Sequence, residues 1–539
     1  MEAPAARKLN LVYARLRRSA ALAVFCATLL CTRSAWSQTD LSGYWILRVP
    51  NSDGTTRDSF IQFDESGETI SGTLSGRGPR ATPITGTFKD GQLHFTTQPP
   101  AEPSAPAPGA PPAYPFRPQV YDGTYQDGKL LLHTQNPRQG LIQGVAERTT
   151  REATLPPSPL PLPPLKDLPD NGLVRTPPMG WNSWNKFAGK VDDASVRAMA
   201  DAMVSSGMRE AGYIYINIDD TWEGGRDAAG DIVTNRKFPD MKALADYVHS
   251  KGLKIGIYSS PGPKTCAGYE GSFGHEVQDA KTYAAWGIDY LKYDLCSARA
   301  IYDSSPEQLQ ALYQKMGEAL ESTGRPIVFS LCEYGNGDVW KWGAKAGGNL
   351  WRTTGDIRDS WASMDRIGFS QIDIARYAQP GHWNDPDMLE IGNGGMNADE
   401  YRTHMSLWSL LSAPLLAGND LRDMSDETKS ILMNREVIAI DQDPAAKPVQ
   451  LLSQNDKLEV LSRPMQDGSV IVGVFNRGDA AVQGGFSWAS LNLGGPATAL
   501  QVRDLWKHQD VSVKGDSYSD EVPAHGVALL RVASASKTP

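Results

Sequence analysis

The stretch Tyr-Leu-Lys-Tyr-Asp-Leu-Cys at residues 290–296 ends an apolar run with the length and composition of a buried strand. That strand carries Lys292 and closes on Asp294. A buried charge without a partner is costly, so these two side chains, two residues apart on one strand face, serve each other or a ligand. A second acid, Asp356, ends a similar run. Two carboxylates aimed into one pocket are the minimum equipment for cleaving a glycosidic bond.

The surrounding sequence repeats a strand, loop and helix pattern from residue 176 to residue 444. This alternation predicts a parallel sheet closed into a (β/α)8 barrel. A doubly wound sheet is the alternative, but it needs a glycine-rich phosphate turn after the first strand, and none is present there. The expected strands are 180–182, 213–218, 254–258, 290–293, 326–331, 350–353, 382–384 and a last one near 409–413, and the expected helices include 193–206, 241–251 and 306–323.

Both flanks of the barrel alternate with period two, as antiparallel strands do. Residues 38–155 show short strands separated by Ser-Gly and Asp-Gly turns, which predict an all-β accessory domain, either a barrel or a sandwich. A Pro-rich linker at 156–171 precedes the catalytic barrel at 172–448, and residues 449–539 predict a β-sandwich. The fold class is therefore α/β, a TIM barrel with an N-terminal all-β module and a C-terminal antiparallel sandwich.

The first residues, 1–37, have the features of a secretory signal peptide. A basic segment precedes a short apolar run at 20–30, and Ala-Trp-Ser at 35–37 fits a cleavage site. An anchoring helix is the alternative, although the run is short for a membrane span. We expect an exported protein, secreted or periplasmic, without a membrane span after cleavage. Cleavage leaves three cysteines, Cys266, Cys296 and Cys332. Their odd number predicts one disulfide and one free thiol, and the spacing does not choose the pair.

The charge, the spacing of the histidines and the absence of a serine motif argue against nucleic-acid binding, a zinc site and an esterase. The net charge is -9, from 53 basic and 62 acidic residues, and no basic block follows the N-terminal segment, so a nucleic-acid partner is not expected. The histidines of the barrel region do not form a pair at zinc-ligand spacing; they are His249, His275, His382 and His404. A Gly-x-Ser-x-Gly elbow is also lacking, which disfavours an esterase. A hard cation held by carboxylates is the alternative, although no sequence feature supports it. We expect no metal and no cofactor.

Polar side chains gather at the predicted strand ends, where (β/α)8 enzymes keep their active sites. An isolated acid at a strand end is more often a helix cap, but acids follow five of these strands. Carboxylates, cationic side chains and tryptophan rings together suit a sugar, which needs an apolar face to stack on and many hydroxyls to bond. The residues in question are Trp184, Asp219, Asp220, Trp222, Tyr258, Lys292, Asp294, Glu333, Arg352, Asp356, Trp383, Asp385 and Asp387.

Several of these residues lie in segments that resemble the α-galactosidases of glycoside hydrolase family 27. The segments are 176–184, 218–222, 264–268, 290–294, 351–360 and 381–388. Six linked motifs in the same order make the resemblance specific. It covers the barrel and, more loosely, the C-terminal sandwich, whereas the N-terminal module lies outside it.

The resemblance implies a retaining exo-α-galactosidase that releases terminal α-linked galactose from oligo- or polysaccharides through a covalent glycosyl-enzyme. Asp294 resembles the nucleophile and Asp356 the general acid/base. The residues that resemble sugar-binding positions are Trp184, Asp219, Asp220, Tyr258, Lys292, Glu333, Arg352 and Asp387. The paired acids would hold the 4-OH and 6-OH, and Glu333 and Arg352 would hold the 2-OH. The resemblance also implies a Cys266–Cys296 disulfide.

Retention of configuration requires the two catalytic carboxyls to be about 5 Å apart. We expect Lys292 to help keep Asp294 ionised, and the negative neighbour to raise the pKa of Asp356.

Substrate choice stays open in the sequence. Tyr334 follows Glu333 where several relatives carry Trp. The glycines at 335 and 337 leave open how much space the site has for the substituent at C2 of the sugar. An α-N-acetylgalactosaminidase and a β-L-arabinopyranosidase are therefore alternatives, although Glu333 suits a free 2-OH and the paired acids Asp219 and Asp220 suit a 6-OH. A non-catalytic carbohydrate-binding protein would be expected to have replaced one of the catalytic acids. The N-terminal module could bind polysaccharide through exposed Tyr and Trp side chains, or it could only pack against the catalytic barrel.

Overall fold

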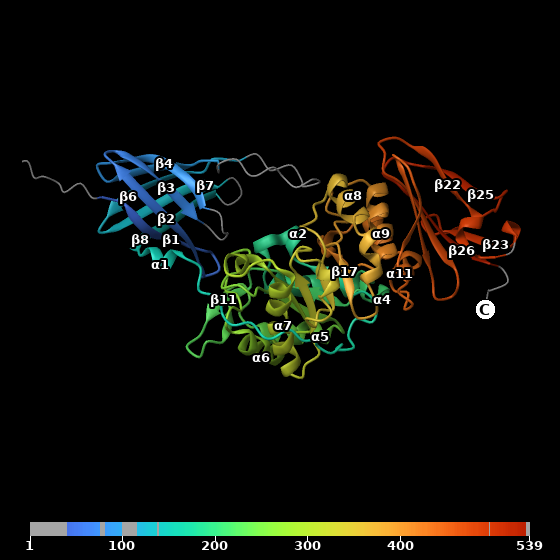
Figure 1. The fold of residues 1–539 in the computed structure, drawn as a ribbon, viewed down its shortest axis with the longest axis horizontal. Coiled ribbons are helices and arrows are strands. Elements are labelled where there is room, and N and C mark those ends of the chain that lie inside the picture. The colour runs from blue at the N-terminus through green and yellow to red at the C-terminus, as the bar shows by residue number, and fades with distance from the viewer. Residues whose placement is uncertain (1–39, 76–80, 100–115, 137–139, 495, 535–539) are drawn as a thin grey trace, which may run out of the picture. The chain divides into compact units, whose positions relative to one another are not determined.

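The fold is seen in a computed structural model, which describes residues 40–75, 81–99, 116–136, 140–494 and 496–534. The predicted signal peptide lies outside these described residues. From Leu41 onward the chain forms one compact unit. In this unit the colours of Figure 1 run from a blue β region through the central α/β region to a red β region. No helix in the described part of the chain is long and apolar enough to cross a membrane.

The N-terminal region is a closed barrel of sequentially paired antiparallel strands, which decides between the barrel and the sandwich. The strands are β1 Gly43–Pro50, β2 Thr56–Ser66, β3 Thr69–Ser75, β4 Ala81–Lys89, β5 Gln92–Thr97, β6 Val120–Gln126, β7 Lys129–Asn136 and β8 Gly140–Thr149. Asp90 and Asp127 have positive φ, as tight Asp-Gly hairpin turns require. Trp45 is fully buried in the barrel core. It is therefore not a surface residue that could hold a polysaccharide.

The central region is a parallel eight-stranded sheet in the order β17-β16-β15-β14-β13-β10-β9-β18. Its strands are β9 Met179–Asn182, β10 Tyr215–Asn217, β13 Lys254–Ser259, β14 Tyr290–Asp294, β15 Val328–Cys332, β16 Leu350–Arg352, β17 Trp383–Asp385 and β18 Leu415–Ala417. A parallel bridge between Leu389 and Ala417 joins the chain after β17 to β18 and closes the barrel. The predicted TIM barrel is confirmed.

Helices alternate with these strands, and polar caps begin them. Asp192 and Ser195 form a capping box on α3, and Ser305 caps α7 just before Pro306. The helices are α2 Trp184–Phe187, α3 Asp193–Ser205, α4 Met208–Ala211, α5 Met241–Ser250, α6 Glu276–Trp286, α7 Pro306–Ser322, α8 Trp361–Phe369, α9 Ala398–Leu411, α10 Asp426–Leu432 and α11 Arg435–Asp441. A short hairpin of β11 Glu223–Arg226 and β12 Ile232–Thr234 follows β10.

The predicted last barrel strand, 409–413, is wrong. Residues 409–411 are the end of helix α9, and the strand β18 starts only after Pro414. From Tyr401 to Leu411 nearly every residue of this helix is buried, so the sequence lacks the polar face that normally identifies a helix.

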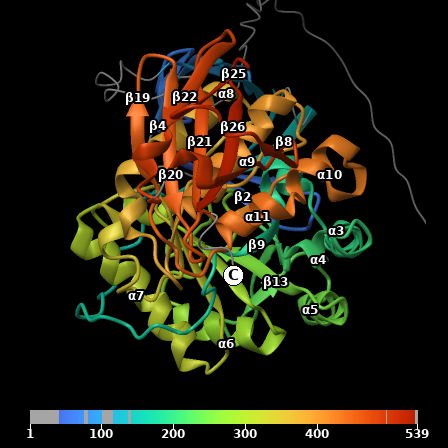
Figure 2. The ribbon, with the colours of Figure 1, turned by 90° about the vertical axis from the view of Figure 1, so that its right-hand side faces the viewer.

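The C-terminal region is the predicted antiparallel sandwich. One sheet has the order β19-β20-β21-β26-β23-β24 and the other pairs β22 with β25. Their bounds are β19 Gln450–Gln454, β20 Leu458–Pro464, β21 Val470–Asn476, β22 Val482–Ser487, β23 Leu500–Asp504, β24 Gln509–Val511, β25 Ser517–Val522 and β26 Val527–Ser534. Figure 2 shows this region in red, with α9 nearby. Phe475 and Leu529 of the sandwich belong to the same apolar cluster as Leu407 of α9.

Candidate active site

The polar cluster predicted at the strand ends lies on the C-terminal rim of the barrel. Asp294 is the last residue of β14, and Glu333 directly follows β15. Arg352 ends β16 and pairs in register with Asp385 at the end of β17. Because the strands are parallel, their carboxyl ends meet at one face, and the acids of distant sequence segments converge there.

Lys292 forms its ion pair with Asp219, not with Asp294. Its Nζ lies 2.8 Å from Asp219 Oδ2, and both side chains are largely buried. Burial opposes the charge of Lys292, but Asp219 outweighs this and raises the lysine pKa well above its usual value. Residues two apart on a strand are about 7 Å apart, whereas a long side chain pointing into the barrel reaches another strand end. The same Asp219 oxygen accepts from Asn182 Nδ2 at 2.9 Å.

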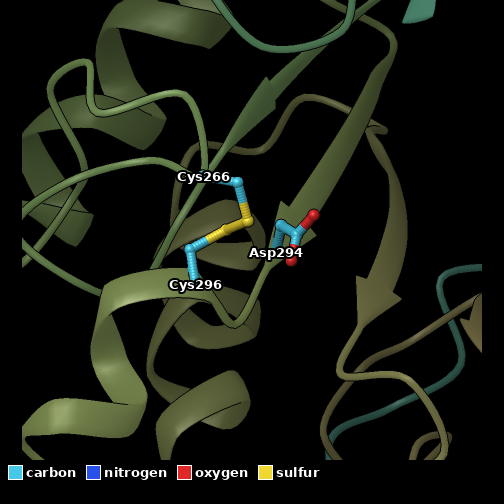
Figure 3. Close-up of side chains that lie close together, drawn as sticks. All are labelled: Cys266, Asp294 and Cys296. Atoms are coloured by element: carbon cyan, nitrogen blue, oxygen red, sulfur yellow. A yellow bond between two sulfur atoms is a disulfide. The ribbon is translucent and has the colours of Figure 1, made fainter. Parts of the chain in front are cut away.

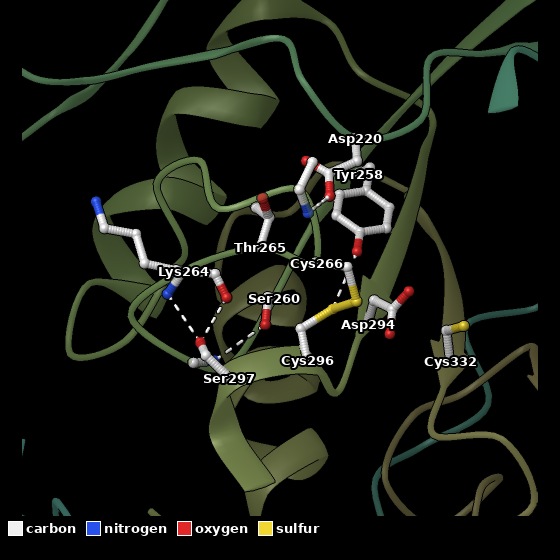
Figure 4. Close-up of a disulfide and its surroundings, with 12 residues drawn as sticks. Asp220, Tyr258, Ser260, Lys264, Thr265, Cys266, Asp294, Cys296, Ser297 and Cys332 are labelled. Atoms are coloured by element: carbon white, nitrogen blue, oxygen red, sulfur yellow. Dashed lines mark hydrogen bonds between the residues drawn. A yellow bond between two sulfur atoms is a disulfide. The ribbon is translucent and has the colours of Figure 1, made fainter. Parts of the chain in front are cut away.

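Asp220, the second of the paired acids, is held from the loop after β13. The Ala267 N–H donates to Asp220 Oδ2 at 2.6 Å. Figure 4 shows Asp220 among the surroundings of the Cys266–Cys296 disulfide. Burial raises the pKa of Asp220 to about 7. Its other oxygen, Oδ1, is buried without a hydrogen-bond partner in the described part of the chain. A buried acceptor of this kind is suited to a ligand hydroxyl.

A disulfide joins that same loop to the end of β14. Cys266 and Cys296 are bonded, with Cα atoms 5.0 Å apart, as the resemblance implied, and Cys332 is a buried free thiol. Figure 3 shows Asp294 beside this disulfide. The sulfurs and the Asp294 carboxylate lie within 4.8 Å of one another, but bonded sulfurs do not form a metal site. Tyr258 contacts Cys296 Sγ through its hydroxyl at 3.2 Å.

Asp294 receives a hydrogen bond that the sequence did not indicate. The Tyr334 hydroxyl donates to Asp294 Oδ1 at 2.6 Å. Burial raises the pKa of Asp294, while Lys292 and the Tyr334 hydroxyl act in the opposite direction. Tyr334 has a positive φ of 64°, which turns its ring back toward the nucleophile candidate. The signal available in the sequence was a tyrosine directly after the acid at a strand end.

Asp356 is paired with Arg352. Arg352 Nη2 lies 3.1 Å from Asp356 Oδ1 and 2.8 Å from Asp387 Oδ2. Although the protein atoms around the exposed carboxylate partly desolvate it and oppose its ionisation, Arg352 dominates and lowers the pKa of Asp356. The expected rise of this pKa is therefore wrong in the free protein, because the arginine outweighs the negative neighbour. The Asp356 side chain is 65% exposed, so it lies at the open side of the rim.

Two further predicted residues complete the rim. Glu333 is fully buried, its Oε1 accepts from the Gly335 N–H at 3.2 Å, and burial raises its pKa well above the usual value. Its Oε2 is buried without a partner among the described residues. Trp184 begins α2, and its backbone N–H donates to Asn182 Oδ1 at 2.9 Å. Asn182 in turn donates to Asp219, so Trp184 is linked to Asp219.

A (β/α)8 barrel that presents paired acids and cationic side chains on this rim has the arrangement that a glycoside hydrolase needs. The family model described as alpha galactosidase A matches residues 176–443, and that of the alpha galactosidase C-terminal beta sandwich domain matches 455–532. The chain therefore belongs to the α-galactosidase A family of glycoside hydrolases.

Individual relatives agree with this family. An α-galactosidase of Cyamopsis tetragonoloba is 49% identical over 366 residues, which cover 67% of this chain and 87% of that protein. The α-galactosidase A of Cellvibrio japonicus is 46% identical and covers 67% of this chain and 92% of its own length. The crystal structure of α-galactosidase I from Mortierella vinacea matches with a TM-score of 0.65 and 37% identity, over 69% of this chain and all of that chain.

Proposed function

We propose that this chain is a retaining exo-α-galactosidase in which Asp294 is the nucleophile and Asp356 the general acid/base. The observation that carries this proposal is the pair itself: Asp294 at the end of β14 and Asp356 after β16, on one rim and close enough for Asp356 to act on the pKa of Asp294. Asp294 attacks the anomeric carbon while Asp356 protonates the leaving oxygen. Asp356 then takes a proton from water, which attacks the glycosyl ester and releases galactose.

The unpartnered carboxyl oxygens of Asp220 and Glu333 support sugar-binding roles for both residues. We assign the 4-OH and 6-OH to Asp219 and Asp220, and the 2-OH to Glu333 and Arg352. A Cβ at position 335 would lie 2.3 Å from the Thr353 carbonyl oxygen. That side of Gly335 is therefore filled by backbone, and we propose that the site takes a free 2-OH and not an N-acetyl group. Trp184, Tyr258, Lys292 and Asp387 complete the proposed site.

The domain limits and the export of the protein belong to the same proposal. We propose an accessory barrel at 38–155, a linker at 156–171, the catalytic barrel at 172–448 and the sandwich at 449–539. The linker contacts the catalytic barrel, since Leu160 exchanges backbone hydrogen bonds with the Tyr302 hydroxyl. The disulfide supports an oxidising compartment, secreted or periplasmic.

A panel of nitrophenyl glycosides tests the assignment. The wild type should hydrolyse the α-galactoside far faster than the α-N-acetylgalactosaminide or the β-L-arabinopyranoside. Asp294→Asn should lower turnover of the α-galactoside by about 10³-fold or more, because the covalent step loses its nucleophile. Near-normal hydrolysis by that variant, or a preference for another glycoside in the panel, would contradict the proposal.

A further inference from the structure

The Tyr334 hydroxyl contacts the proposed nucleophile, and this contact has consequences for the two chemical steps. It donates to Asp294 Oδ1 at 2.6 Å. The second carboxylate oxygen, Oδ2, is thereby left for the anomeric carbon. Burial raises the pKa of Tyr334 far above its usual value, so the phenol remains protonated and remains a donor at every working pH.

The position of the Tyr334 ring is fixed from several sides. The guanidinium carbons of Arg299 and Arg352 lie 4.9 Å and 5.7 Å from the ring centre. Gly335 donates its N–H to the Arg352 carbonyl at 3.0 Å, directly after the left-handed Tyr334. The hydroxyl is therefore preorganised toward Asp294 and need not move during the reaction.

The strength of this hydrogen bond changes along the reaction coordinate. In the first step, the C1–Oδ2 bond forms, the bond to the leaving oxygen breaks, and Asp294 loses its negative charge. In the second step, water attacks C1, Asp356 takes its proton, the C1–Oδ2 bond breaks and Asp294 regains its charge. A hydrogen bond to a charged group is about twice as strong as one to a neutral group. The Tyr334 bond therefore weakens in the first step and strengthens in the second.

We propose that Tyr334 is a catalytic residue that accelerates the second step, hydrolysis of the glycosyl-enzyme, by stabilising the Asp294 carboxylate as it leaves. The inference rests on the nucleophile role proposed for Asp294. Only interactions that are stronger in the transition state than in the preceding state accelerate a step, and this hydrogen bond meets that condition in the second step alone.

The test is Tyr334→Phe, which removes one oxygen atom and keeps the ring. With 4-nitrophenyl α-galactoside, kcat should fall about fivefold, the factor that roughly 1 kcal/mol corresponds to. KM should fall in parallel because the covalent intermediate accumulates, and kcat/KM at the pH optimum should not fall. Rapid mixing should show a burst of nitrophenol, and intact-protein mass spectrometry should show one added galactosyl group.

Tyr302→Phe is the matched control, because among the described residues its hydroxyl forms hydrogen bonds with the linker residue Leu160 alone. It should leave all rate constants unchanged. Thermal unfolding of both variants separates a folding defect from a catalytic one. If Tyr334→Phe unfolds early, the same measurements are made on Tyr334→Trp, which keeps an aromatic ring but lacks the phenol hydroxyl. This variant should also show a burst and a parallel fall in kcat and KM, and the absence of both would contradict the proposal.

An equal loss of kcat and kcat/KM without a burst would overturn the proposal, because the first step would then be impaired. That outcome would leave the proposed function intact as long as Asp294→Asn is inactive and the wild type prefers the α-galactoside. An active Asp294→Asn would instead remove the basis of both.

Discussion

Thr221 lies directly after the paired acids and adopts a backbone conformation that its side chain disfavours. Its φ is 90°, in the left-handed region. Its N–H donates to Glu223 Oε2 at 3.1 Å, its carbonyl accepts from Asn235 Nδ2 at 2.8 Å, and its hydroxyl accepts from Lys237 Nζ at 2.8 Å. Every polar group of Thr221 is thus held by the β11–β12 hairpin or the residues after it, which fixes the turn that carries Asp220.

At position 221, glycine should give a more stable protein than alanine, which is the reverse of the usual order of stability. A left-handed backbone costs a residue with a Cβ about 1–2 kcal/mol, whereas glycine ordinarily costs about 0.5–1 kcal/mol relative to alanine. Both substitutions lose the same hydroxyl, so Thr221→Gly should be more stable than Thr221→Ala by about 1 kcal/mol. Thermal and urea unfolding measure the difference, which should appear as a higher Tm of about 2 °C. An alanine variant as stable as the glycine variant would refute the strain argument.

The same turn should affect substrate selectivity. Glu223→Leu leaves the buried Thr221 N–H without an acceptor, at a cost of about 1–3 kcal/mol, whereas Glu223→Gln keeps a carbonyl oxygen there. If Asp220 holds the 6-OH, the leucine variant should lose about tenfold, or roughly 1.4 kcal/mol, in the ratio of kcat/KM for aryl α-galactoside over aryl β-L-arabinopyranoside. The glutamine variant and the exposed Lys190→Met control should keep that ratio. An unchanged ratio in Glu223→Leu would show that the turn does not position Asp220.

Two other contacts give separate predictions. Lys292→Met leaves a buried carboxylate without its ion-pair partner, so the free energy of unfolding should fall by about 3–5 kcal/mol, and urea unfolding with unchanged stability would contradict the pairing. Cys296→Ser opens the disulfide to Cys266, which spans 30 residues, and should lower stability by about 3–4 kcal/mol on the chain-entropy estimate. Thermal unfolding of the reduced wild type should then match the variant, and a variant as stable as the oxidised wild type would show that the bridge is not stabilising.

Strand positions in the catalytic barrel could be predicted because buried parallel strands are short apolar runs with polar ends. The strand β14 is such a run, and it ends on Asp294 as expected. The same rule misplaced the last strand, since helix α9 is apolar on nearly all sides and resembles a buried strand in composition. Periodicity separates helix from strand only where one face meets water, and α9 lacks such a face.

The membership of the candidate site could be predicted, but its pairings could not. Strand ends place side chains on the rim, and that rule requires no knowledge of rotamers. The partner of Lys292 depends on which strand end its long side chain reaches across the barrel. The sequence left open whether Lys292 serves Asp294 or a ligand, and its ion pair is with Asp219, while its charge also lowers the pKa of Asp294. The role of Tyr334 depends on a single left-handed residue that redirects its ring.

The pKa shifts of the two proposed catalytic carboxyls in the free protein run in the opposite direction to what the first step needs. Burial raises the pKa of Asp294, whereas Arg352 lowers that of Asp356, yet the first step requires an ionised nucleophile and a protonated acid. If the sugar 2-OH binds Arg352, the arginine acts less on Asp356, and exclusion of water strengthens the repulsion from Asp294, so binding should raise the pKa of Asp356.

The basic limb of kcat, which reports the complex, should then lie at higher pH than that of kcat/KM, which reports the free enzyme. Arg352→Gln removes the positive charge, which disfavours the carboxylate and raises the pKa of Asp356, and should therefore move the basic limb of kcat/KM to higher pH. The acidic limb, which belongs to ionisation of Asp294, should not follow it. A basic limb that stays in place in Arg352→Gln would show that Arg352 does not control the pKa of the acid.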